Sequence, residues 1–426
     1  MPRILFSTLG SLGDLYPLLA VARALRDRGT ECLFAVHSDQ VPLVDGEGFA
    51  VMPNSYTLAD FAGSIGLSED EVIRKTFSDP NFLFRDILPF DLENVARQIC
   101  AWMGEVDLVA TTFQAEAARL AAETAEVPIA SLILQPMMVF DPSQPPLIPA
   151  MPPVVARPGR VGQLWNRAVL SLGLFTIRMA HGHRVNRVRQ ALELPKHTGV
   201  PWFEPGIAPR LSVGLYPAFL HDHAPDLTPP VTIAGFVPYN GPEAALDPEL
   251  DAFLDAGTAP IVFTLGSNAT FLDQDFYAQS LAAARDLGQR CVLLTGAGWD
   301  GTATGDDVIQ RDYVPHHLLF ERASMIVHHG GIGTFCRAMA AGKPQLIVPF
   351  GTDQPDNAAR AERMGFARTL PAGAYSVEKA SGLIGALLND ANARQAATVV
   401  AARMAQSDGP AVAADALLSA LTQASR

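Results

Sequence analysis

The chain has few charged residues and no long apolar run, and each shortage excludes a class of protein. Only 18% of its 426 residues are charged, and an acidic excess gives a formal net charge of −13. Nucleic-acid binders need clustered lysine and arginine to meet the phosphate backbone, so this balance argues against a nucleic-acid partner. The longest candidate membrane span, Ala168 to Ile177, has about half of the ~20 apolar residues that a bilayer requires.

Cysteine is also scarce. The four cysteines, at positions 32, 100, 291 and 336, are scattered without metal-ligand spacing. This usage indicates free thiols in a reducing compartment rather than a disulfide framework. Residues 2–7 read as a strand, without the charged leader and apolar core of a signal peptide. We therefore expect a soluble, cytoplasmic protein, with peripheral contact to a membrane surface left open and the oligomeric state not predicted.

What the sequence does contain is a repeated strand–turn–helix pattern. An apolar strand at 4–8, a glycine turn at 10–14, a helix at 15–28 and a strand at 31–36 open a doubly wound parallel sheet. The same order restarts with a strand at 261–265. With 49% apolar residues, the chain is long enough for two such cores. The fold class expected is α/β, with two Rossmann-like domains across a cleft: an N-terminal domain (1–235), a linker (236–247), a C-terminal domain (248–409) and a last helix (410–426) that crosses back to the N-terminal domain.

The stretch from Val327 to Gln354 has the features of a diphosphate site. An apolar run leads into a glycine turn, and helix-forming residues follow from Thr334. The start of a helix exposes unpaired N–H groups and carries the positive end of the helix dipole, and glycines let an anion approach the backbone. A second strand then delivers Asp353 and Gln354, whose side chains suit sugar hydroxyls.

Asp14 has two interpretations. It follows the first strand, at the edge of the sheet where the ligands of doubly wound folds gather, so it suits a general base. The same position in the first turn of a helix also suits a carboxylate that caps the helix.

Two further segments leave alternatives open. Residues 135–160 are dense in proline and methionine, which fits either an adaptable loop lining an apolar pocket or a surface connector. Residues 161–194 read as a long helix carrying Trp165, Phe175, Met179 and several arginines. Packing against the protein is the preferred interpretation, and contact with a bilayer surface is the alternative.

Five motifs together resemble one family. They are Gly10-Ser-Leu-Gly-Asp14, Phe263-Thr-Leu-Gly-Ser267, Tyr313-Val-Pro-His316, His328-His-Gly-Gly-Ile-Gly-Thr334 and Asp353-Gln354. They resemble the GT-B-fold, nucleotide-sugar-dependent glycosyltransferases of natural products, glycopeptides and sterols, and within these the bacterial rhamnosyltransferases that form rhamnolipids. The resemblance spans essentially the whole chain and implies a donor-binding C-terminal domain and an acceptor-binding N-terminal domain.

The resemblance also implies a role for each motif. Asp14 falls at the position of the catalytic base. Tyr313 and Val314 fall at the nucleobase, and Asp353 and Gln354 at the sugar. The residues at the positions that contact the donor diphosphate are His328, Gly330, Gly333, Thr334 and Ser267.

Two patterns typical of metal sites are weak in this sequence. Asp273-Gln-Asp275 lies where a helix is expected to begin, which itself favours acidic residues. His221-Asp-His223 has no further ligand nearby. We expect no metal and no cofactor, because the nucleotide sugar is a co-substrate.

The predicted reaction is inverting transfer of a hexose or deoxyhexose, glucose or rhamnose, from a UDP- or dTDP-sugar. The predicted acceptor is a hydroxyl of an apolar small molecule such as a lipid, terpenoid, macrolide or polyphenol. The alternatives are a nucleotide-sugar epimerase or hydrolase of the same fold, or a non-catalytic partner that binds nucleotide sugars.

Overall fold

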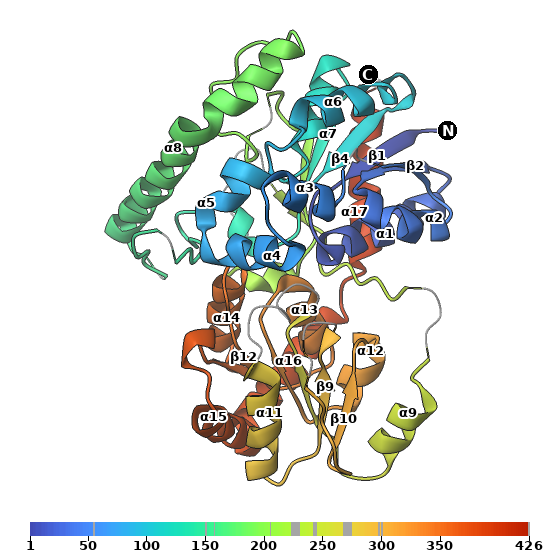
Figure 1. The fold of residues 1–426 in the computed structure, drawn as a ribbon. Coiled ribbons are helices and arrows are strands. Elements are labelled where there is room, and N and C mark those ends of the chain that lie inside the picture. Colours follow the sequence, from blue (N-terminus) through green and yellow to red (C-terminus); the bar gives the residue numbers. More distant parts are fainter. Residues whose placement is uncertain are drawn as a thin grey trace. The chain divides into compact units, whose positions relative to one another are not determined.

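The two halves predicted from the sequence are present as two units. The computed structural model describes residues 1–53, 56–149, 151–156, 158–204, 206–222, 231–241, 245–266, 275–296, 299 and 301–424. The first unit comprises Met1–Tyr239 with Asp408–Arg426, and the second comprises Asn240–Ser407. The predicted linker, residues 236–247, is thus divided between them, and the last helix belongs with the first unit (Figure 1).

A seven-stranded, parallel sheet forms the centre of the first unit, in the order β3-β2-β1-β4-β5-β6-β7. Buried apolar residues fill both faces of its central strands, as expected where helices cover a parallel sheet on both sides. The strands are β1 (Arg3–Ser7), β2 (Glu31–Val36), β3 (Ala50–Pro53), β4 (Leu108–Thr111), β5 (Ile129–Ile133), β6 (Leu211–Gly214) and β7 (Val231–Ile233).

Helices connect these strands. The helices are α1 (Leu12–Arg26), α2 (Val41–Gly46), α3 (Leu58–Ser64), α4 (Glu69–Ser78), α5 (Pro80–Phe82), α6 (Leu92–Cys100), α7 (Glu116–Thr124), α8 (Arg160–Ala191) and α17 (Gly409–Ala424). Shorter turns of helix are η1 (Ser38–Gln40), η2 (Leu83–Ile87), η3 (Met103–Glu105), η4 (Pro136–Met138) and η5 (Ala218–Leu220).

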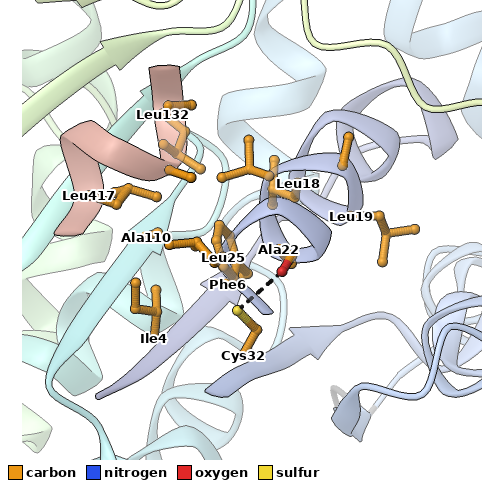
Figure 2. Close-up of a cluster of buried hydrophobic side chains, with 14 of the residues drawn as sticks. Ile4, Phe6, Leu18, Leu19, Ala22, Leu25, Cys32, Ala110, Leu132 and Leu417 are labelled. Carbon is orange, nitrogen blue, oxygen red and sulfur yellow. Dashed lines mark hydrogen bonds between the residues drawn. The ribbon is translucent and has the colours of Figure 1, made fainter. Parts of the chain in front are cut away.

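The C-terminal helix α17 completes the core of the first unit. Ala413, Ala414 and Leu417 are fully buried in the same cluster as strand β1 and helix α1. Figure 2 shows Leu417 beside the side chains of the first strands and α1. The first unit therefore needs the chain terminus for its packing, although some 170 residues of the second unit intervene.

The second unit has a six-stranded, parallel sheet in the order β10-β9-β8-β11-β12-β13. Its strands are β8 (Ile261–Thr264), β9 (Cys291–Leu294), β10 (Val308–Arg311), β11 (Met325–His328), β12 (Gln345–Ile347) and β13 (Ala367–Thr369). Its helices are α9 (Pro248–Asp255), α11 (Asp275–Asp286), α12 (His316–Leu319), η7 (Phe320–Arg322), α13 (Ile332–Ala340), α14 (Gln354–Arg363), η8 (Ala372–Ala374), α15 (Val377–Asn389) and α16 (Ala391–Met404).

The expected fold class, two doubly wound α/β domains, is confirmed. In each sheet the first strand lies in the middle, and successive strands are added first on one side and then on the other. This arrangement creates one switch point between β1 and β4 and another between β8 and β11, and the ends of strands at such points are where ligands of this fold bind. In the described part of the chain, no helix is both long and apolar enough to cross a membrane.

Candidate functional site

The switch point of the second sheet brings together two of the predicted motifs. Strand β8 ends before Gly266, and β11 ends at His328, so the two turns that follow are neighbours in the sheet. Gly266 has φ +68°, a left-handed conformation that favours glycine. A Cβ atom on Gly266 would lie 2.6 Å from Cε1 of His329, so the missing side chain leaves room for that imidazole.

His328, the first histidine of the glycine motif, is fully buried and occupied by protein partners. Its Nδ1 accepts a hydrogen bond from the Gly330 amide (3.0 Å), which places the ring proton on Nε2, and Nε2 donates to Oε1 of Gln345 (2.8 Å). Burial lowers the pKa of His328 to about 4, so the ring is neutral near pH 7. The geometry therefore assigns His328 a structural role and does not favour the predicted contact with the diphosphate.

The next residue, His329, is the partly exposed histidine of the pair. It lies just beyond β11, whose four residues are all buried. Burial is again the main cause that lowers its pKa, to about 3, with a further contribution from His328. A neutral imidazole at this position can donate one hydrogen bond to an anion but adds no positive charge.

Helix α13 begins at Ile332, after the two glycines that follow this histidine. Gly331 is its N-cap residue, and its first helical hydrogen bond runs from Phe335 N to Gly331 O (2.9 Å). The amides of Gly333 and Thr334 accordingly have no partner among the described residues, and Gly333 is exposed. These two predicted residues lie where a helix start can receive an anion.

Gly330 has a different role from Gly333 and Thr334. Its φ is +94°, and a Cβ atom there would lie 2.7 Å from Cγ2 of Ile347. Its amide is bonded to His328, and its carbonyl accepts from Nδ2 of Asn357 (2.9 Å). Gly330 thus shapes the turn, whereas its amide is not available to a diphosphate.

Asp353 and Gln354 are both buried and fasten the loop between β12 and α14. Oδ2 of Asp353 accepts from the Ile332 amide (3.0 Å) and from Asn357 Nδ2 (2.8 Å). Oε1 of Gln354 accepts from the Phe350 amide (2.7 Å). Burial is the main cause that raises the pKa of Asp353. The two residues lie beside the start of α13, and these hydrogen bonds are to the protein itself.

Tyr313 and Val314, the two residues predicted to meet the nucleobase, differ in exposure. Tyr313 is 67% exposed, which suits a ring that stacks on a nucleobase, whereas Val314 is buried in the core with only its backbone able to meet a ligand. Arg337 interacts electrostatically with Tyr313, and burial lowers the pKa of its guanidinium. This cation, one turn into α13, was missed in the sequence; its only signal there was its spacing of three residues from Thr334.

Some predicted positions fall outside the described residues. These are Ser267 of the diphosphate motif, Asp273 of the acidic pair and His223 of the histidine pair. Across the ranges that are described, no group of three or more histidine, cysteine, aspartate or glutamate side chains is arranged to hold a metal ion.

In the first unit, Asp14 is the third residue of helix α1 and forms a capping box with Ser11. Its Oδ2 accepts from the Ser11 amide (2.7 Å) and from Ser11 Oγ (3.2 Å). A Cβ atom on Gly10 would lie 2.1 Å from this oxygen. Glycine at position 10 therefore leaves the space that the Asp14 carboxylate occupies. The capping interpretation is realised, and because a carboxylate has about four acceptor positions, it does not exclude a base.

Two polar side chains that sequence reasoning missed hold this turn in place. His37, after strand β2, has Nε2 3.1 Å from the Leu9 carbonyl, and Gln40 Nε2 donates to the Gly10 carbonyl (2.9 Å). Neither residue belongs to a recognisable motif. Both follow the neighbouring strand β2 and are far from the turn in the sequence, so only the structure brings them together.

An apolar cavity adjoins the switch point of the first sheet. Its volume is about 20 Å³, and a site needs roughly 10–15 Å³ to hold one water molecule, so an organic acceptor requires side chains to move. Gln114 carries a buried Oε1 that has no partner in the described part of the structure. None of the lining residues comes from 135–160, for which a pocket-lining loop was one of the two interpretations. The lining comprises Ser7, Thr8, Leu9, Tyr56, Leu88, Phe90, Leu92, Val95, Ile99, Gln114, Ala115 and Ala117.

Chemically, the second unit offers an anion site at a helix start, a neutral imidazole and an exposed aromatic ring. The first unit offers a carboxylate in the first turn of helix α1 and, at the end of strand β1, a small apolar cavity. These two sets match the donor and acceptor halves of a group transfer.

Comparison with known proteins gives the same class of activity. Residues 281–420 match the family described as Erythromycin biosynthesis protein CIII-like, C-terminal domain. The vancomycin aglycone glucosyltransferase of Amycolatopsis orientalis is 30% identical over 442 residues, covering 99% of this chain and 98% of that protein. The solved glycosyltransferase of kitacinnamycin superposes with a TM-score of 0.74 at 19% identity, over 99% and 100% of the two chains. The glycosyltransferase VinC, solved in complex with dTDP, gives 0.69 at 20% identity, again over 99% and 100%.

Proposed function

This chain belongs to the EryCIII-like, GT-B glycosyltransferases of natural-product biosynthesis, which use nucleotide-sugar donors, and on that premise we propose its donor, acceptor and catalytic residues. The sugar is a hexose or deoxyhexose, glucose or rhamnose, carried by UDP or dTDP. The acceptor is a hydroxyl of an apolar small molecule, and transfer inverts the anomeric carbon.

The start of helix α13 is the observation that carries the proposal. The unpartnered amides of Gly333 and Thr334 receive the donor diphosphate, and His329 donates the hydrogen bond that the sequence assigned to His328. Preorganised donors of this kind stabilise the charge that develops on the departing diphosphate. Because His329 is neutral near pH 7, the helix dipole and the amides supply most of that stabilisation.

Tyr313 stacks on the nucleobase, and its exposed ring suits this role. Asp353 and Gln354 orient the sugar with the acceptor capacity left after they fasten their loop. Ser267 remains a predicted diphosphate contact. Of the two nucleotides, dTDP has the additional support that VinC was solved with it.

On the acceptor side, Asp14 takes the proton of the acceptor hydroxyl as the hydroxyl oxygen attacks the anomeric carbon and the bond to the diphosphate breaks. The apolar cavity beside β1 receives the acceptor skeleton once its side chains move. Gln114, with its unpartnered oxygen, accepts a hydrogen bond from a second polar group of the acceptor. Burying such an oxygen without a partner is costly, which gives the acceptor an anchoring point.

The experiment is a matrix of UDP- and dTDP-linked glucose and rhamnose against a library of apolar hydroxyl compounds, read by mass spectrometry. The mass gained by a product identifies the sugar, and the anomeric proton coupling reports inversion. Gln114→Leu, which keeps the size and removes the oxygen, should raise KM for the acceptor by about 10-fold and leave donor affinity unchanged.

Donor consumption without a glycosylated product would instead indicate a hydrolase or epimerase. Binding of the nucleotide without any turnover across the matrix would indicate a non-catalytic partner.

A further inference from the structure

Helix α8 presents two apolar faces, and the protein covers only one of them. The side chains of Val169, Leu170 and Val185 are buried, and Arg189 forms a salt bridge with Glu123 that anchors the helix (2.5 Å). Packing against the protein, the preferred interpretation from the sequence, describes this face, whereas Trp165, Phe175 and Met179 are exposed. Figure 1 shows α8 as a long helix at the margin of the first unit.

The exposed face forms a stripe. Its members lie on one side of the helix, opposite the buried set, in two groups (161–165 and 172–179) that are seven residues, or about two turns, apart, and they extend over about 27 Å at 1.5 Å per residue. Each is between 50% and 81% exposed, whereas a soluble surface rarely gathers so many large apolar side chains. We call this set the α8 stripe: Val161, Leu164, Trp165, Leu172, Phe175 and Met179.

Charge around the stripe has one sign. Residues 142–192 contain seven arginines and no aspartate or glutamate, in a chain whose net charge is −13. Arg160, Arg167 and Arg178 lie about two and about three helical turns apart, so they form a row along one flank of the stripe. They are exposed, and none forms a salt bridge within the described residues.

We propose that the α8 stripe and its row of arginines bind an anionic lipid surface, with α8 lying flat in the interface. An apolar face with Trp and Phe, flanked by arginine and lacking acidic residues, has the chemistry of an interfacial helix. Trp165 fits the boundary between water and lipid, because its ring is half exposed while its Nε1 donates to the Pro153 carbonyl (2.9 Å). The placement would bring the enzyme to apolar acceptors that partition into a bilayer.

A second copy of the chain is the competing occupant of this face. Paired helices need opposite charges beside their apolar seam, and a second α8 offers only more arginine. The charge pattern therefore favours an anionic partner over self-association.

The test measures binding of the full-length protein to vesicles of phosphatidylcholine with and without phosphatidylglycerol, by flotation. We expect binding to the anionic vesicles alone, weakened by salt as the Debye length shortens. Replacing Arg160, Arg167 and Arg178 together by glutamine should weaken binding on the order of 100-fold, at about fivefold for each arginine. The matched control replaces Arg74, Lys196 and Arg363, three exposed basic residues elsewhere, with the same change of net charge and should lose much less.

Apolar contact is tested separately. Leu172→Gln with Phe175→Gln should abolish vesicle binding, whereas Val399→Gln with Val412→Gln, exposed aliphatic residues on α16 and α17, should not. Trp165→Phe should keep binding but remove the blue shift of tryptophan emission that vesicles induce. Transfer to a water-soluble acceptor should be unchanged in all these variants, which separates a failure here from a failure of the proposed activity.

Three results would overturn the proposal. They are equal binding to neutral and anionic vesicles, equal binding by the arginine variant and its control, and a lipid-free dimer by light scattering that Phe175→Gln converts to monomer.

Discussion

Replacing Asp14 by asparagine separates its two roles, because the structure assigns it one and the proposed mechanism adds another. Asparagine keeps the size of the side chain and an oxygen that accepts from the Ser11 amide. It removes the negative charge near the start of α1 and the capacity to take a proton. The loss of charge at a helix start costs about 0.3–1 kcal/mol of the free energy of unfolding, and loss of a general base costs about 10²–10⁴ in turnover.

The chain contains a matched control for the structural part. Asp60 forms the same capping box at the start of α3, where its Oδ2 accepts from the amide (2.8 Å) and the hydroxyl (2.8 Å) of Thr57. These hydrogen bonds lower the pKa of Asp60, so its charge also contributes to the cap. Asp60→Asn should therefore cost a similar amount of stability and leave kcat unchanged.

The assay combines chemical denaturation of both variants with steady-state kinetics at saturating donor. Asp14→Asn should bind dTDP like the parent protein, because the proposed diphosphate contacts lie in the second unit. The base assignment would be refuted if Asp14→Asn retained most of its turnover, or if Asp60→Asn lost as much.

Three further predictions concern the second unit. His329→Gln should weaken dTDP binding by about 10-fold with normal thermal unfolding, whereas His328→Gln should mainly lower the unfolding temperature, as measured by calorimetry; equal affinity losses with no difference in stability would contradict this assignment. Burial lowers the pKa values of His316, His328 and His329 from 6.5 to about 3, 4 and 3. The stability that these neutral side chains contribute is therefore complete above about pH 6.5 and is lost as the pH falls toward 4. An unfolding temperature that does not change over this pH range would contradict the prediction. Turnover should survive chelation by EDTA, because the proposed diphosphate site consists of amides and a neutral imidazole, and a full loss restored by magnesium would exclude it.

The sequence was sufficient to predict the fold because each strand and turn depends mainly on residues that are close together in the chain. The inner strands β8, β9 and β11 are short, buried and mainly apolar runs, and the turns after β8 and β11 carry glycines whose positive φ only glycine adopts at low cost. Since parallel strands end at one edge, the motifs after β8, β11 and β12 had to lie near one another. That reasoning needs no knowledge of side-chain contacts.

The choice between two adjacent histidines was beyond the sequence. The end of β11 decides which of the two histidines is enclosed. Gln345 on the next strand also contributes, because its Oε1 accepts a hydrogen bond from Nε2 of His328. Strand ends are uncertain by a residue or two, and because both faces of β11 are buried, its apolar pattern does not show which histidine is the first outside it. Asn357 and Arg337 were missed for a related reason, since Asn357 acts through Gly330 and Asp353, and Arg337 through Tyr313, rather than through a motif of their own.

The residues that mark the site also hold it together. Asp353 links α14 to the start of α13, and Asn357 joins that carboxylate to the Gly330 carbonyl. A substitution in this network would loosen the helix start that receives the diphosphate even if the side chain never touches the donor. A loss of activity by itself therefore does not identify a ligand contact. Donor affinity and unfolding must be measured on one variant, because a contact residue lowers affinity at constant stability, whereas a fastening residue lowers both.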